Sequence, residues 1–175
     1  MPCLSKLNLR NCLKLDRLPH LPSLKEFSIS DLERGTLPDG GWEGLVTLET
    51  LFIYSFEKLE SLPEGLGQLK KLKSLTIFGC EKLESLPHSF GQLEVLNELE
   101  IRDCNELGSL PHGLQHLSHL QMLVIYNCPL LSERCKREGG PDWSKISRIP
   151  NINIDGEWIQ EQRRWVRLIT ITIPS

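Results

Sequence analysis

A repeat of 24 residues dominates the sequence between Leu48 and Leu131. Each copy opens with a leucine, has a second leucine three residues later, and has an isoleucine two residues after that. The four opening positions are Leu48, Leu72, Leu96 and Leu120. A fixed period in this range is typical of a solenoid, in which each copy forms one coil and stacked coils share a continuous core.

The spacing of apolar residues within a copy predicts the shape of a coil. The Leu-x-Ile alternation predicts a short strand with one apolar face. A Leu-Pro pair then ends regular structure, because proline lacks a backbone N–H and restricts the residue before it. These pairs are Leu62-Pro63, Leu86-Pro87 and Leu110-Pro111. We therefore expect an irregular or short helical outer arm in each coil and a parallel sheet with about 4.8 Å between strands.

Two further copies precede Leu48, so that residues 1–131 contain about six copies. They open at Leu4 and Leu24, and the second has an irregular outer arm with Gly40, Gly41 and Trp42. The first strand is expected close to Met1, without the polar end unit that normally closes a solenoid. This predicts that the chain is the end of a longer array.

The period ends after Cys128-Pro129. We interpret residues 132–156 as a closing unit with a helix capped by Ser132, a second helical turn capped by Asp142, and a last strand containing Ile152 and Ile154. Residues 157–175 form a tail in which EWIQEQRRWVRL has helical spacing of apolar residues and ITITIPS alternates like an edge strand.

Composition excludes several classes of partner and location. A net charge of -3 predicts no nucleic-acid partner, because phosphate binding requires a basic surface. The sequence has no apolar run long enough for a membrane span and no N-terminal secretory signal. Four of the six cysteines share one repeat position with Phe56 and Leu32, which predicts buried, reduced thiols and a cytoplasmic protein. These four are Cys12, Cys80, Cys104 and Cys128.

The sequence predicts no enzyme, metal site or cofactor. His112, His116 and His119 replace residues at solvent-facing repeat positions, so a zinc site is not expected. Cys135 has no CxxC partner that would indicate a nucleophile or metal ligand. The carboxylates that recur with the repeat fit a solvated outer face better than acid–base catalysis. They are Glu57, Glu60, Glu81 and Glu84.

The residues between the inward leucines and isoleucines are predicted to form an exposed surface of the sheet. Tyr54, Phe78 and Tyr126 recur at one position there, with Arg102 between two of them. Aromatic residues and arginine are frequent anchors of protein interfaces. We therefore predict a protein-binding site at Phe52, Tyr54, Thr76, Phe78, Glu100, Arg102, Val124 and Tyr126. The alternative is that these side chains pack on one another or beneath a flanking domain.

The repeat L-x-x-L-x-I-x-x-C-x-x-L-x-x-L-P resembles the carboxy-terminal repeats of plant coiled-coil nucleotide-binding leucine-rich-repeat disease-resistance proteins. The segment CPLLSERCKREGGPDWSKISRIPNINIDG is similar to the end of that domain, so the resemblance covers Leu4 to about Trp158. It implies an α/β, right-handed leucine-rich-repeat solenoid with a parallel sheet on its concave face.

The same resemblance implies a function in plant innate immunity. The domain would recognise a pathogen effector, or a host protein that an effector has modified, in the cytoplasm. The alternative is a structural fragment that makes autoinhibitory contacts with the nucleotide-binding domain of its own receptor. The phosphate-binding pattern G-x-x-x-x-G-K-[ST] of that domain does not occur in this sequence.

Overall fold

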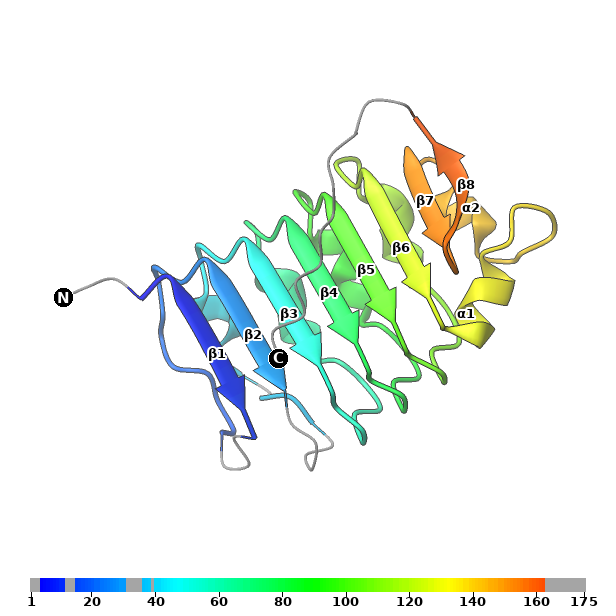
Figure 1. Cartoon of the computed structure of the whole chain (residues 1–175). Coiled ribbons are helices and arrows are strands. Elements are labelled where there is room, and N and C mark those ends of the chain that lie inside the picture. Colours follow the sequence, from blue (N-terminus) through cyan, green and yellow to red (C-terminus); the bar gives the residue numbers. More distant parts are fainter. Residues whose placement is uncertain (1–3, 12–14, 31–35, 39, 163–175) are drawn as a thin grey trace.

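One eight-stranded sheet runs the length of this computed structural model, which describes residues 4–11, 15–30, 36–38 and 40–162. The strands follow chain order across the sheet (Figure 1). Strands β1 to β7 are parallel, and β8 is antiparallel to β7. Their bounds are β1 Lys6–Arg10, β2 Glu26–Ser30, β3 Thr50–Tyr54, β4 Ser74–Phe78, β5 Glu98–Arg102, β6 Met122–Tyr126, β7 Asn151–Ile154 and β8 Glu157–Glu161.

The sheet keeps the register that the repeat predicts. Leu51 pairs with Leu75 and Leu75 with Leu99, so equivalent residues of successive copies lie side by side. The same alignment holds for the isoleucines, and both series are almost completely buried. Stacking equivalent residues buries the leucines of each coil against those of its neighbours, which confirms the predicted solenoid.

The outer arms are short 3-10 helices that lie behind the sheet (Figure 1). Their bounds are η1 Trp42–Gly44, η2 Glu64–Gln68, η3 His88–Gln92 and η4 His112–His116. A proline precedes each of the last three, since its fixed φ suits the start of a helix and its missing N–H is not needed there. The arms pack so closely that a Cβ added at Gly113 would lie 2.7 Å from the Cα of Gly91.

The second coil has the local irregularity that its glycines predict. Gly41 has a φ of 94°, which glycine adopts without steric cost. This backbone turns the Trp42 side chain into the core, where its Nε1 donates a hydrogen bond of 2.8 Å to the Pro38 carbonyl. The Trp42 ring also lies 6.3 Å from the Phe27 ring, so one large side chain fills the space behind β2.

The closing unit contains helices α1, Pro129–Arg134, and α2, Trp143–Ile146. The helix predicted to begin after Ser132 begins at Pro129 instead, because proline is well suited to the first helical position. Asp142 precedes α2 as predicted, but its side chain makes no capping hydrogen bond. The predicted last strand is confirmed as β7.

The predicted helix after Gly156 is wrong for the part that the structure describes. Residues Glu157–Glu161 form strand β8, which pairs with β7. The reason is the Asp155-Gly156 pair, whose φ values of 51° and 88° produce a tight turn between antiparallel strands. The remainder of the predicted helix and the strand predicted at ITITIPS lie largely outside the described residues. None of the described helices is long and apolar enough to cross a lipid bilayer.

Candidate protein-binding face

The outward residues of β1 to β6 form a surface that we call the strand face. It consists of three rows that cross the sheet, because equivalent residues are paired in register. The first row is Lys6, Glu26, Thr50, Ser74, Glu98 and Met122. The second is Asn8, Ser28, Phe52, Thr76, Glu100 and Val124. The third is Arg10, Ser30, Tyr54, Phe78, Arg102 and Tyr126.

All eight predicted binding residues lie on the strand face, in its second and third rows. They are Phe52, Tyr54, Thr76, Phe78, Glu100, Arg102, Val124 and Tyr126. The side chains of Phe78 and Tyr126 are 39% and 46% exposed, which is high for aromatic residues within a sheet. The sheet therefore brings the eight predicted residues together, with Phe78 and Tyr126 exposed and the other six half-buried. Binding by them stays a prediction.

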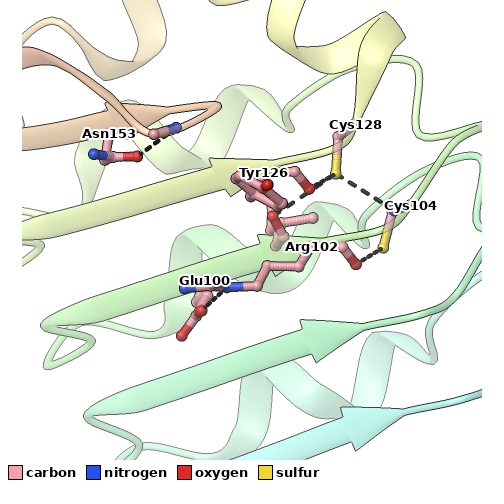
Figure 2. A network of polar contacts seen from close by, with 8 residues as sticks. Glu100, Arg102, Cys104, Tyr126, Cys128 and Asn153 are labelled. Atoms are coloured by element: carbon pink, nitrogen blue, oxygen red, sulfur yellow. Dashed lines mark hydrogen bonds and ion pairs between the residues drawn. The ribbon is translucent and has the colours of Figure 1, made fainter. Parts of the chain in front are cut away.

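Arg102 connects the two predicted rows. Its Nε forms an ion pair with the carboxylate of Glu100, and its guanidinium carbon lies 5.7 Å from the centre of the Tyr126 ring. Figure 2 shows the three side chains gathered on the outer side of β5 and β6. A guanidinium within about 6 Å of an aromatic ring is attracted to the ring face. These contacts orient Arg102 and Tyr126 before any partner arrives.

A similar contact occurs at the other end of the third row. The guanidinium carbon of Arg10 lies 5.9 Å from the centre of the Tyr54 ring. The Tyr54 hydroxyl lies 3.4 Å from Oδ1 of Asn8, across two strand positions. Tyr54 is half-buried as a result. The alternative that face residues pack on one another thus describes Tyr54 better than Phe78 or Tyr126.

Cysteine thiols support the strand face from beneath. Cys80, Cys104 and Cys128 are free and buried at the repeat position that Phe56 also fills, while Cys12 and Leu32 lie outside the described residues. The Cys128 Sγ lies 3.3 Å from the Tyr126 carbonyl and accepts a hydrogen bond of 3.4 Å from the Cys104 N–H (Figure 2). Its side-chain hydrogen bond with Cys104 and its burial raise the pKa of Cys128. A protonated, buried thiol packs as a small apolar group and is a poor nucleophile.

A buried carboxylate fixes the closing unit to the fifth coil. Asp142 is 1% exposed and accepts hydrogen bonds from the Leu110 N–H at 2.9 Å and from Nη2 of Arg134 at 3.1 Å. Lys145 Nζ lies 2.8 Å from Asp142 and donates to the Leu110 carbonyl at 2.6 Å. Burial raises the pKa of Asp142, but hydrogen bonds from Arg134, Lys145 and Leu110 outweigh it and keep the pKa below its ordinary value.

The residues considered for chemistry lie away from the strand face. His112 and His116 bound η4 on the outer arm, and His119 follows it, all three exposed. Cys135 is buried behind α1, and burial raises the pKa of its thiol to about 12. Across the described ranges, no group of three or more His, Cys, Asp or Glu side chains has a geometry that could hold a metal ion.

Trp158 is a surface residue that the sequence reasoning missed. It lies on β8, is 46% exposed, and pairs with Asn153, which in turn pairs with Val124 of the second row. The helix predicted for this segment gave Trp158 no position on the sheet. The signal that would have located it is Asp155-Gly156 between two alternating segments, a strong indication of a hairpin.

Comparisons with known proteins agree with this architecture. A family model described as a leucine-rich repeat region matches residues 2–172. The solved leucine-rich repeat domain of the type III effector XopL has a TM-score of 0.52 and 25% identity, with 75% of this chain and 55% of that chain covered. The chain therefore spans little more than half of that domain.

A leucine-rich repeat protein of Leptospira interrogans has a TM-score of 0.37 and 17% identity, with 87% of this chain and 55% of that chain covered. Among curated proteins, none matches significantly. Domains with this fold are generally protein-interaction scaffolds and typically have no enzymatic activity. Because the family model covers nearly the whole sequence and the coils are stacked as described, the chain belongs to the leucine-rich repeat region family.

Proposed function

We propose that the strand face is the recognition surface of a plant innate-immune receptor, acting in the cytoplasm. Its partner is a pathogen effector, or a host protein that an effector has modified. The observation that carries this proposal is the third row, in which exposed Phe78 and Tyr126 lie on either side of Arg102. The plant receptor assignment is supported by the sequence resemblance described above, and protein binding by the family.

The physical argument for recognition is that the third row is already ordered. Arg102 is held by Glu100 and by the Tyr126 ring, so binding would immobilise few additional side-chain bonds. Ordering a flexible side chain at an interface costs roughly 0.5–1.5 kcal/mol, and a prepared surface avoids part of that cost. Large aromatic side chains then supply apolar area, and arginine supplies directional hydrogen bonds.

A second candidate function uses the same surface within one receptor. In this version the strand face contacts the receptor's own nucleotide-binding domain and holds the receptor inactive. The supporting observation is that the strand face extends over six strands and has exposed residues at both ends, Arg10 on β1 and Tyr126 on β6. A face of this extent can accept a neighbouring domain as well as a separate protein.

Alanine substitution of the aromatic row tests both candidates. We expect the combined Tyr54→Ala, Phe78→Ala and Tyr126→Ala variant to lose at least about 100-fold in affinity, since interface anchors contribute about 2 kcal/mol or more each. Binding would be measured by calorimetry with a panel of effector proteins and with isolated nucleotide-binding domains of plant receptors. Binding to an effector supports recognition, and binding to a nucleotide-binding domain alone supports the second candidate.

The matched control replaces exposed apolar residues that lie off the strand face. These are Val46, Val95 and Leu130, which are 53%, 37% and 52% exposed. Their combined alanine variant is expected to bind like the wild type. Equal loss in both variants, or equal affinity of the aromatic variant and the wild type, contradicts the proposal. Circular dichroism would confirm that both variants are folded.

A further inference from the structure

The strand face continues beyond β6 onto the terminal hairpin. Asn153 of β7 pairs with Val124, and Trp158 of β8 pairs with Asn153. Paired residues of neighbouring strands project from the same side of a sheet. The exposed Trp158 side chain therefore extends the second row, and the Asn153 side chain is fixed by accepting a hydrogen bond of 3.1 Å from the Gly156 N–H (Figure 2).

Two carboxylates lie in the first row of the same region. Glu98 pairs with Met122, Met122 with Asn151, and Asn151 with Glu161. Three steps of about 4.8 Å place Glu98 and Glu161 about 14 Å apart, with Met122 between them. Both residues are exposed, and neither carboxylate has an ion pair or side-chain hydrogen bond within the described part of the chain. We call Glu98, Met122, Tyr126, Trp158 and Glu161 the C-terminal patch.

Three other carboxylates on or beside the strand face, Glu26, Glu49 and Glu100, have cationic partners within the chain. Glu26 pairs with Lys6 at 2.8 Å, and Glu49 pairs with Lys73 at 2.8 Å. Glu100 pairs with Arg102, which is also occupied by the Tyr126 ring. The unpaired carboxylates Glu98 and Glu161 thus lie in the first row, next to the second row that Trp158 extends, while Tyr126 lies in the third row and Arg102 is already engaged.

We infer that the C-terminal patch binds an extended protein segment with arginine or lysine side chains next to apolar ones. An extended segment that covers Trp158 and crosses the first row removes water from Glu98 and Glu161, which is favourable only if the segment supplies positive charge. An acidic segment would be repelled by Glu98 and Glu161. The inference rests on the proposed function, because it specifies the chemistry of the partner that the strand face recognises.

Selection from random peptides tests this chemistry without knowledge of the natural partner. The full chain would be used to select a displayed library of random peptides about 12 residues long. We expect the selected peptides to be enriched in arginine or lysine adjacent to leucine, isoleucine or aromatic residues. Their binding should fall about tenfold or more for the Glu98→Lys and Glu161→Lys double variant and for Trp158→Ala, at low salt.

Matched controls separate the patch from general charge and apolar effects. Glu138→Lys changes an exposed carboxylate in the turn between α1 and α2, and Leu130→Ala removes an exposed apolar side chain of α1. Both should bind the selected peptides like the wild type. A selected peptide whose basic residues are changed to glutamate should regain binding to the Glu98→Lys and Glu161→Lys double variant.

The outcomes distinguish this inference from the proposed function. Peptides that depend on Tyr54, Phe78 and Tyr126 but are acidic or uncharged overturn the inference and leave strand-face recognition in place. Failure to select any peptide that depends on these aromatic residues counts against both. An equal loss of binding with Glu138→Lys also overturns the inference, because it shows a general charge effect.

Discussion

Asp142 fixes the closing unit to the fifth coil. The closing unit lies beside Leu110, the residue of the Leu-Pro pair that precedes η4. Asp142 accepts from the Leu110 N–H, and Lys145 donates to the Leu110 carbonyl. Two charged side chains thus satisfy backbone groups that would otherwise be buried without partners, a situation that is costly in free energy.

Replacing Asp142 with asparagine is expected to lower the free energy of unfolding by about 2–3 kcal/mol at pH 7, because charged hydrogen bonds in a buried site are lost. The carboxylate has a lowered pKa in the folded state. Its contribution is therefore fully present above the pKa of the unfolded chain, about 4, and disappears as the pH falls through the folded pKa. Urea unfolding of both forms at several pH values measures the difference.

The control for this prediction is Glu138→Gln, an exposed change that should have little effect at any pH. A constant difference between wild type and Asp142→Asn down to about pH 2 would contradict the assigned role. In that case packing, and not charge, would be responsible for the loss.

At the scale of elements, the arms η3 and η4 approach each other backbone to backbone at two glycines. A Cβ at Gly91 would lie 2.8 Å from the Cα of Gly113, and backbone atoms cannot move aside as a side chain can. The two glycines therefore allow neighbouring arms to approach each other. Phe90 and Leu114, which follow or precede these glycines by one residue, are both buried behind the sheet.

Gly113→Ala is expected to destabilise the chain by about 1–3 kcal/mol, the usual cost of forcing extra volume into a packed region. Gly108→Ala is the matched change, since a Cβ there would be 3.9 Å from its nearest neighbours. It should be neutral or slightly stabilising, because alanine restricts the unfolded chain. Thermal unfolding of the two variants compares them directly, and equal melting temperatures would refute the close-packing account.

The repeat made most elements predictable, because one pattern of apolar residues specifies the same strand and core position in every coil. Leu51, Leu75 and Leu99 each mark a strand, and their regular spacing predicts that they lie side by side in the sheet. The terminal hairpin was mispredicted because Trp158 and Ile159, with the apolar residues after them, also fit helical spacing. There the turn residues Asp155 and Gly156 decided the outcome, since their backbone conformation directs the chain back along β7.

The candidate site was predictable only in part, for a related physical reason. Outward positions within a repeat follow from alternation, so Phe78 and Tyr126 could be placed on a surface. Contacts between residues far apart in the sequence could not be predicted. Asp142 was expected to cap α2, whereas its partners include Arg134 and Leu110. These contacts depend on how the closing unit packs against the fifth coil, and a local sequence pattern contains no information about that packing.

At the scale of the whole molecule, each coil packs mainly against its two neighbours. Strand β4 is paired with β3 and β5, whereas β1 is paired only with β2 in the described part of the chain. Leu7 and Leu9 of β1 are accordingly half-buried, while the equivalent residues of β4 are fully buried. In a linear array of this kind, stability is approximately a sum of coil terms and interface terms.

Hydrogen exchange should therefore be graded along the array. We expect the amides of β1 to exchange through local openings of low free energy and those of β4 and β5 to exchange with the highest protection. Mass spectrometry of deuterium uptake would measure the gradient. Uniform protection from β1 to β6 would indicate that the array opens as one cooperative unit and would contradict the expectation.

The constant register of the parallel strands has a consequence for how such a chain can vary. Because equivalent residues recur every 24 positions from Leu48 onward, a whole coil can be duplicated or lost and the junction still joins matching positions. A one-residue change within a strand would move its inward leucines to the outer surface, whereas the shorter first coil, from Leu4 to Leu24, keeps the register. Gain or loss of a whole coil therefore changes which residues lie on the strand face, while the buried leucines of the remaining coils still stack.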